Sequence, residues 1–212
     1  MEKFFEYSFS SEMLCIGERV KKGTFKPCLT TIPCSTVSEA LKAHLEREDI
    51  FSLGFLDDEY LAEIDKKKKR GFMVTSPKDS VLLVSKLPLV TEYLIEAKGK
   101  IFIRALNGLK ETLKKYPKFQ IGALKSKGLG NCQVEFRRVL RNEDLKLTKG
   151  RLRTRIYEDK DTLAILGIRE IFKPIYGYLY KKTGPVSGYY QRSLFEGSVL
   201  RGPKFILEEV ES

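Results

Sequence analysis

The stretch QIGALKSKGLGNCQVEF, residues 120–136, places three glycines around two lysines and a serine, immediately before a strand-like run. Glycine adopts positive φ without a Cβ clash, so closely spaced glycines can turn backbone N–H groups toward an anion. In an extended loop, Lys125 and Lys127 would point the same way, with the Ser126 hydroxyl between them. The pattern predicts a cradle for one or two phosphates of a nucleic-acid backbone. The alternative is a tight turn that is only incidentally basic.

The same stretch does not match two common nucleotide-binding motifs. A P-loop requires GxxxxGK[ST] before a helix, whereas here the basic residues precede the last glycines and a strand follows. A dinucleotide-binding GxGxxG should also open a helix. The sequence therefore predicts neither a P-loop nucleotide site nor a dinucleotide-binding site.

Two further groups of residues have types that suit RNA. Arg151, Arg153 and Arg155 alternate in RLRTRI, so one strand face would present three guanidiniums to successive phosphates; surface ion pairs are the alternative. Downstream, tyrosines interleave with cations, which suits unstacked bases, although buried core tyrosines are the more common outcome. The residues in this second group are Tyr176, Tyr178, Tyr180, Lys181, Lys182, Tyr189, Tyr190 and Arg192.

His44 is the only histidine and the one candidate for acid–base catalysis. A histidine with a pKa of about 6.5 can take a proton from a ribose 2′-OH, while a lysine such as Lys42 stabilises the phosphorane and Tyr60 assists. Helical spacing from Val37 and Leu41 also places His44 against an apolar face. A structural histidine is the favoured interpretation.

The sequence contains no group of residues with the spacing of a metal-binding site. The consecutive acids in LDDEY, residues 56–60, would not converge on one ion from a helix, and they indicate a solvated end. The cysteines form no CxxC pair, which argues against zinc. Free thiols in a reducing compartment are expected, with a Cys28–Cys34 disulfide as the alternative. We expect no metal and no cofactor. The four cysteines are Cys15, Cys28, Cys34 and Cys132.

Periodicity predicts the elements that position these residues. A helix is expected over 35–48, with Ser35 or Thr36 as N-cap and Glu39 completing a capping box. A short helix is expected over 57–64, and a further helix is expected to end before Pro117. The basic run 66–70 is interpreted as a solvated loop, with a phosphate-attracting patch as the alternative. Strands are expected at 3–9 with continuation over 13–16, 72–76, 80–85, 91–97, 100–104 and 132–140.

The order strand, helix, strand, strand, helix, glycine-rich loop, strand predicts an α+β protein. It is the βαββαβ order of a ferredoxin-like (RRM-like) domain: a four-stranded antiparallel sheet with both helices on one face and the other face free. We place this domain at 1–145. The short aromatic segments of 146–212, separated by Gly and Pro, predict a β-rich C-terminal appendage.

Composition bounds the possible partners. The chain has 212 residues, 42% hydrophobic and 32% charged, which is typical of a globular protein. It contains no apolar run near the roughly 18 residues that cross a bilayer, and no signal-peptide core, so a cytoplasmic protein without a membrane partner is expected. A net charge of +11 favours a polyanion. Abundant Lys and Glu with scarce Asn and Gln are typical of hyperthermophile proteins, and they explain part of that charge.

Two motifs carry a family resemblance. IGALKSKGLGNCQVEF, after the second expected helix and before the last strand, resembles the glycine-rich loop of the RAMP superfamily, the repeat-associated proteins of CRISPR systems. TIPCSTVSEALKAHL, residues 31–45, resembles that superfamily's signature at the first helix, although Cys34 and Glu39 stand where glycine or proline is more usual. The two motifs occur in the expected order and cover roughly residues 1–145.

The resemblance implies a non-catalytic subunit that binds guide RNA (crRNA) inside an antiviral CRISPR effector complex with other subunits. It is closest to the subunits that grip the 5′ handle of the guide, with the backbone-forming subunits as the next choice. One alternative is a metal-independent endoribonuclease that processes repeat RNA with His44 as general base. Another is a scaffold that binds only proteins. The residues that would contact RNA backbone by this resemblance are Gly122, Lys125, Ser126, Lys127, Gly128 and Gly130.

Overall fold

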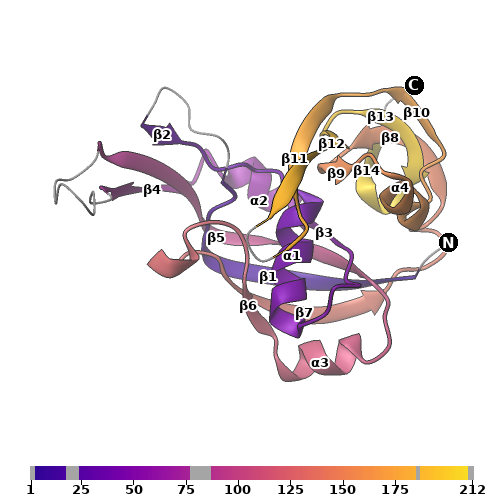
Figure 1. Cartoon of the computed structure of the whole chain (residues 1–212), viewed down its shortest axis with the longest axis horizontal. Coiled ribbons are helices and arrows are strands. Elements are labelled where there is room, and N and C mark those ends of the chain that lie inside the picture. The colour runs from indigo at the N-terminus through magenta and orange to yellow at the C-terminus, as the bar shows by residue number, and fades with distance from the viewer. Residues whose placement is uncertain (1–2, 18–23, 77–86, 185–186, 210–212) are drawn as a thin grey trace.

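The computed structural model describes residues 3–17, 24–76, 87–184 and 187–209, and its N-terminal part is built on one mixed sheet (Figure 1). Antiparallel pairing gives the order β3–β5–β1–β7–β6. The expected strand at 80–85 lies outside the described residues. The strands of this sheet are β1 (Phe4–Leu14), β2 (Phe25–Lys26), β3 (Ser52–Leu56), β4 (Arg70–Thr75), β5 (Leu89–Arg104), β6 (Lys118–Gln120) and β7 (Asn131–Val139).

Strand β5 is longer than the sequence suggested, because the segments expected at 91–97 and 100–104 form one strand of 16 residues. Its first half pairs with β4 and β2, and its second half pairs with β3. Gly99 does not end the strand. A Cβ at this position would lie 2.1 Å from the Phe55 carbonyl oxygen and 2.5 Å from the Phe9 ring, so glycine is needed for close packing.

Two helices pack on one face of the sheet. Helix α1 (Cys34–Leu45) and helix α3 (Leu109–Lys115) bury their apolar residues in the same core as the inward residues of β1, β5 and β7. The short helix α2 (Asp58–Glu63), expected from the sequence, precedes the basic run. The core residues that the two helices contribute are Val37, Ala40, Leu41, Leu109 and Leu113.

The opposite face of the sheet is divided into an apolar end and a polar end. At the apolar end, Phe205 of the C-terminal segment packs on Phe4 and Phe102, with ring centroids 5.3 Å and 5.0 Å away. Toward the other end the outward side chains of β1, β5 and β7 are polar or charged. The second face is therefore only partly free, which narrows the open surface expected from the sequence.

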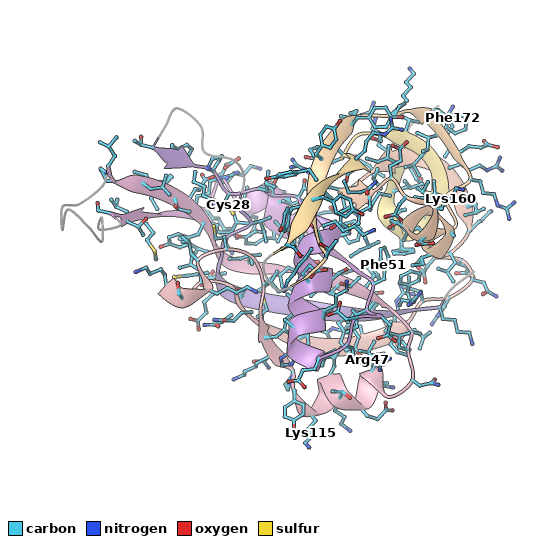
Figure 2. The ribbon with its side chains drawn as sticks, in the orientation of Figure 1. Cys28, Arg47, Phe51, Lys115, Lys160 and Phe172 are labelled. Carbon is cyan, nitrogen blue, oxygen red and sulfur yellow. The ribbon has the colours of Figure 1, made fainter. Side chains whose placement is uncertain are left out.

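The C-terminal segment consists mainly of strands, as expected, and forms two small sheets ordered β10–β13–β8–β14 and β11–β12–β9. Phe172 and Lys160 lie on its outer rim (Figure 2). Its elements are β8 (Leu147–Leu152), β9 (Ile156–Tyr157), α4 (Lys160–Leu166), β10 (Glu170–Lys173), β11 (Tyr176–Lys182), β12 (Gly188–Leu194), β13 (Val199–Pro203) and β14 (Leu207–Glu209).

The C-terminal segment also supplies partners for the start of α1. The Cys34 amide donates to the Arg155 carbonyl oxygen at 2.9 Å, and the Thr154 hydroxyl donates to the Ile32 carbonyl oxygen at 2.7 Å. The predicted capping box is wrong: Pro33 is the N-cap and no side chain caps the helix. Thr36 and Glu39 do not cap because a tertiary contact already satisfies the first amide, and Glu39 instead binds Lys42.

The four cysteines are buried free thiols, so the alternative of a Cys28–Cys34 disulfide is wrong. Burial raises the pKa of Cys34 to about 12 and that of Cys132 to about 11. Among the described residues, no three His, Cys, Asp or Glu side chains are grouped to hold a metal ion. No helix in those ranges is long and apolar enough to cross a membrane.

The contact between Thr154 and Ile32 predicts a measurable coupling between the two parts of the chain. Thr154→Val removes the hydroxyl from a fully buried site and leaves the Ile32 carbonyl unpaired, so the free energy of unfolding should fall by about 1–3 kcal/mol. Urea denaturation followed by circular dichroism measures the change. Thr24→Val, at an exposed position, is the control and should leave stability unchanged. Equal stability of both variants would contradict the coupling.

Candidate nucleic-acid interface

The glycine-rich loop is fixed at its base to the carboxyl end of β1. The Gly130 amide donates to the Met13 carbonyl oxygen at 2.6 Å, and the Ala123 amide donates to the Cys15 carbonyl oxygen at 2.8 Å. Gly122 and Gly130 have φ values of +85° and +80°, and a Cβ would lie 2.2 Å and 2.0 Å from a backbone oxygen. Both positions therefore require glycine for conformation and for space.

The tip of the loop, residues 125–128, projects into solvent. Lys125, Ser126 and Lys127 are exposed, and neither lysine has a carboxylate within 4 Å in the described ranges. Gly128 has a φ of +86° with open space around its missing Cβ. Leu129 directly after the tip is buried. Two ammonium groups are thus held outward by an anchored loop, and no acidic side chain of the described chain neutralises them.

Two details of the predicted phosphate cradle are corrected by the loop's geometry. The tip is a 3-10 turn over Lys125–Lys127, not an extended loop. With three residues per turn, the two lysines diverge by about 120° instead of pointing the same way. The Gly128 amide donates to the Lys125 carbonyl and the Gly130 amide donates to Met13. These two amides are therefore already used, and the side chains of the tip remain to contact an anion.

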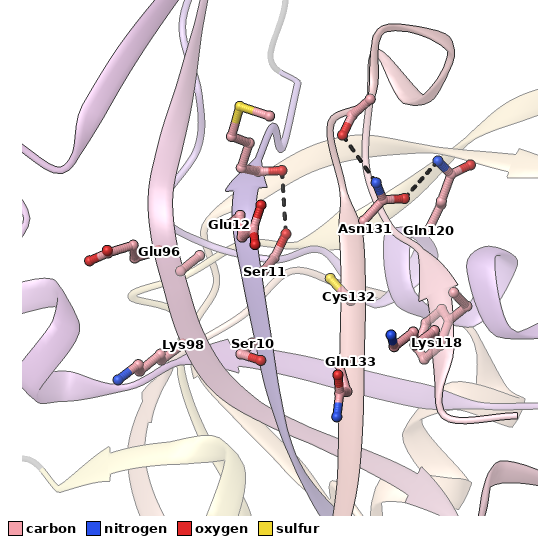
Figure 3. A pocket seen from close by; sticks show the side chains of 14 residues that line it. Ser10, Ser11, Glu12, Glu96, Lys98, Lys118, Gln120, Asn131, Cys132 and Gln133 are labelled. Atoms are coloured by element: carbon pink, nitrogen blue, oxygen red, sulfur yellow. Dashed lines mark hydrogen bonds between the residues drawn. The ribbon is translucent and has the colours of Figure 1, made fainter. Parts of the chain in front are cut away.

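A hollow of about 760 Å³ lies beside the loop on the polar end of the sheet. Its floor is a row of side chains from neighbouring strands, and the register places Lys98, Ser10, Gln133 and Lys118 opposite one another across β5, β1, β7 and β6 (Figure 3). Gly128 also lines the hollow, so the loop tip forms part of its rim.

Hydrogen bonds connect this floor to the loop tip. The Gln120 side-chain amide donates to the Asn131 side-chain oxygen at 2.9 Å, and the Asn131 amide donates to the Gly128 carbonyl oxygen at 3.3 Å (Figure 3). Serine, asparagine and glutamine can exchange hydrogen bonds with base edges and 2′-hydroxyls. The hollow therefore combines neutral polar groups on its floor with cations at its rim.

The charge around the hollow is concentrated at the rim. The floor carries two lysines, Lys98 and Lys118, and two acids, Glu12 and Glu96, so their formal charges cancel, and Glu96 also binds Lys69 at 3.4 Å. At the rim, Lys125 and Lys127 have no carboxylate within 4 Å in the described chain. A polyanion would therefore be attracted mainly to the loop tip, and the floor would favour neutral polar groups.

The predicted row of three arginines is not formed. Strand β8 ends at Leu152, and Arg153 turns to an ion pair with Asp58. Arg155 makes two hydrogen bonds of 2.7 Å to Glu196 and lies over the Phe195 ring. Burial opposes ionisation of Glu196, but the bonds from Arg155 outweigh it and the pKa of that carboxyl is lowered.

For Arg153 and Arg155 the ion-pair alternative therefore describes the structure. Arg151 is exposed, and no ion pair holds it within the ranges that the structure describes. A role in RNA binding stays a prediction for all three arginines. Of the three, Arg151 is the one whose guanidinium does not have to leave a carboxylate to bind RNA.

The basic run at 66–70 is largely neutralised by nearby acids. Lys67 binds Glu63 at 2.6 Å, Lys69 binds Glu96 at 3.4 Å, and Arg70 binds Asp65 and Glu92 at 3.0 Å and 3.2 Å. This arrangement fits the interpretation of a solvated loop better than that of a phosphate-attracting patch.

The side chain of His44 contacts other parts of the protein. Its Nε2 lies 3.0 Å from the Tyr116 carbonyl oxygen, and its ring stacks on Phe119 with centroids 5.4 Å apart. Because a carbonyl only accepts hydrogen bonds, Nε2 carries a proton in this arrangement. Lys42 is held by Glu39 at 3.1 Å. Both side chains are thus engaged with protein groups, and the catalytic role of His44 stays an alternative.

Sequence reasoning missed the polar floor of the hollow. The alternation that identified β7 also separates its two faces, since Cys132 and Val134 are buried while Asn131, Gln133 and Glu135 are exposed. The same alternation places Ser10 and Glu12 on the exposed side of β1. The sequence therefore contained the signal: the apolar residues of these strands identified them, and the polar residues between them form the floor of the hollow.

Comparison with known proteins establishes similarity at the level of the fold. No family model and no curated protein matches the chain. Among solved structures, it is similar to a chain of the Type III-B Cmr-beta bound to cognate target RNA and AMPPnP, with a TM-score of 0.58 and 9% identity, over 92% of this chain and 86% of that chain. A structure of Cmr-beta bound to cognate target RNA gives a TM-score of 0.56, also at 9% identity and with the same coverage.

Gly130 and Gly128 are predicted to differ in their tolerance of alanine. Gly130→Ala combines the strain of a left-handed backbone conformation with a clash against the Ile121 carbonyl, so the free energy of unfolding should fall by about 2–5 kcal/mol. At Gly128 an added Cβ meets open space, so Gly128→Ala should lower the free energy of unfolding by about 1–2 kcal/mol, the cost of the left-handed backbone conformation alone. Thermal and urea unfolding of the two variants measure the difference. Equal losses would show that the loop is not anchored as described.

Proposed function

We propose that this chain is a non-catalytic, guide-RNA-binding subunit of a CRISPR effector ribonucleoprotein complex. The observation that carries the proposal is the anchored loop tip with two unneutralised lysines at the rim of a polar hollow. The fold similarity supports it, because the similar chains come from a complex that was solved with target RNA bound. Of the two RAMP-like sequence signatures, the glycine-rich one forms this loop, and the other lies on α1, whose His44 stacks on Phe119 of β6.

The strand order also supports a ferredoxin-like assignment for the N-terminal part. The pairings β7–β1–β5–β3, with α1 between β1 and β3 and α3 between β5 and β7, follow the βαββαβ arrangement. Strands β2, β4 and β6 are additions to it. We place the division from the appendage near residue 145, although the second core contains residues from both sides of that boundary.

In this proposal the RNA backbone follows the loop tip and the bases or riboses face the hollow. Lys125 and Lys127 neutralise phosphates, and Ser126 offers a hydroxyl. Gly122 and Gly130 act by holding the loop, and Gly128 by closing the turn at its tip. Other subunits of the complex and cytoplasmic location belong to the proposal, as does a grip on the 5′ handle of the guide.

The salt dependence of RNA binding tests this role. Each phosphate contact contributes about 0.7 to the slope of log affinity against log salt for single strands, so Lys125→Ala with Lys127→Ala should lower the slope by about 1.4. Fluorescence anisotropy with labelled guide RNA at several salt concentrations measures it. Lys114→Ala with Lys160→Ala removes the same charge from exposed sites on α3 and α4 and is the matched control.

An unchanged slope in the loop variant, or an equal change in the control, would remove the loop from the interface. A wild-type chain that binds no RNA at low salt would instead support a scaffold that contacts only proteins.

The enzymatic alternative is tested separately. Because His44 donates to Tyr116 and Lys42 is paired with Glu39, we expect purified protein in chelator to leave repeat RNA uncut, and His44→Ala to bind RNA like the wild type. Gel electrophoresis of labelled repeat RNA measures cleavage. Metal-independent cleavage that disappears in His44→Ala would establish the nuclease and overturn the non-catalytic assignment.

A further inference from the structure

Strands β11 and β12 form a hairpin in the C-terminal segment (Figure 1), and the outer face of this hairpin carries a row of tyrosines. Along β11, Gly177 and Leu179 face inward, since Leu179 is buried and Gly177 packs against the Phe195 ring. The alternate residues Tyr176, Tyr178 and Tyr180 face outward and are 49%, 61% and 47% exposed. The sequence had favoured buried core tyrosines here, and the structure shows the opposite.

Cations complete this outer face from the neighbouring positions. Tyr178 pairs with Arg192 and Tyr180 pairs with Tyr190 across the hairpin, so all four side chains lie on one side of it. The Arg192 guanidinium lies 4.6 Å from the centre of the Tyr176 ring and is also paired with Glu158. Lys182, two residues beyond Tyr180, is exposed. Neither strand contains an acidic residue, but Glu158 neutralises Arg192, whereas Lys182 has no ion pair within the described residues.

The spacing of the row matches the thickness of stacked bases. Side chains two residues apart on a strand are separated by about 6.6–6.8 Å, which is twice the roughly 3.4 Å between neighbouring bases of a nucleic-acid strand. The Arg192 guanidinium already lies over the Tyr176 ring, so the spacing leaves room for one flat base between Tyr178 and Tyr180. The Tyr180 ring is held by close packing over Gly188, where a Cβ would lie 2.4 Å from it, and by Tyr190 at 5.7 Å.

We infer that this outer face is a second RNA contact, which binds unpaired bases by stacking while Lys182 attracts the backbone. The inference rests on the proposed RNA-binding function but uses a different part of the chain and a different interaction. An RNA strand is favoured over a protein because the face combines exposed rings at a base-sized spacing with Lys182, a cation that no acid of the described chain neutralises. Stacking on tyrosine is tolerant of sequence, so the contact selects single-stranded RNA by its exposed bases.

Tyr178→Ala in the full-length protein tests the inference, with anisotropy of an unstructured oligouridylate and of an abasic oligomer of the same length. Removing one stacking ring should weaken oligouridylate binding about 5- to 150-fold. Binding of the abasic oligomer, and the salt slope for both probes, should not change. Tyr178→Phe keeps the ring and should bind like the wild type.

Tyr189→Ala is the matched control, because Tyr189 lies opposite Lys181 on the other face of the same hairpin. It should leave oligouridylate binding unchanged. Loss of the loop lysines should lower the salt slope for both probes, whereas loss of Tyr178 should weaken only oligouridylate binding. The two measurements therefore test the loop and the hairpin face independently. Wild-type affinity of Tyr178→Ala, or an equal loss in Tyr189→Ala, would overturn the inference. Loss of assembly with other subunits at unchanged RNA affinity would assign the face to a protein and overturn it equally.

Discussion

The candidate interface depends on one attachment, the hydrogen bonds between the glycine-rich loop and the carboxyl end of β1. The Gly130–Met13 and Ala123–Cys15 bonds hold the loop against this strand end. A Cβ at residue 122 would clash with the Cys15 carbonyl oxygen, and a Cβ at residue 130 would clash with the Ile121 carbonyl oxygen inside the loop. Without this attachment, the chain between β6 and β7 would not present residues 125–128 beside the polar end of the sheet. The glycines thus act mainly through space and conformation, and the lysines supply the charge.

The sheet beneath the loop has two different faces because successive side chains of β1, β5 and β7 point to opposite sides, apart from a register shift between Glu6 and Tyr7. Their inward residues meet α1 and α3 in the main core, and their outward residues form the polar floor and, further along, an apolar end. The C-terminal segment covers that apolar end through Phe205 and also completes the start of α1. It therefore fixes how much of the second face is left open.

Much of the N-terminal fold could be predicted from sequence, because the periodicities of β1, α1, α2 and β7 are local signals. Strand β3 was missed since SLGFL is buried on both sides and does not alternate, and β6 has only three residues. The cap of α1 was wrong because its partner, Arg155, is distant in the chain.

The candidate site was predictable only in part. The three glycines of the loop indicated positive φ from their residue type alone. The divergence of the two lysines depends on the 3-10 turn, and the amides of Gly128 and Gly130 already donate hydrogen bonds within the protein. The spacing of residues in the sequence reveals neither of these. The arginine row failed for a similar reason, since the partners Asp58 and Glu196 come from distant segments. The tyrosines were interpreted as core residues because buried tyrosines are the more common outcome. They are exposed because Gly177 and Leu179 already occupy the inward side of the hairpin.

The central claim is that the lysines of the loop tip contact RNA, and lysine footprinting tests it most directly. Acetylation of exposed lysines, followed by mass spectrometry of the free and the RNA-saturated protein, reports each ammonium group separately. The account predicts that RNA slows modification of Lys125 and Lys127 while Lys114 and Lys160 react as before. Unchanged modification of Lys125 and Lys127 in the saturated complex would contradict it.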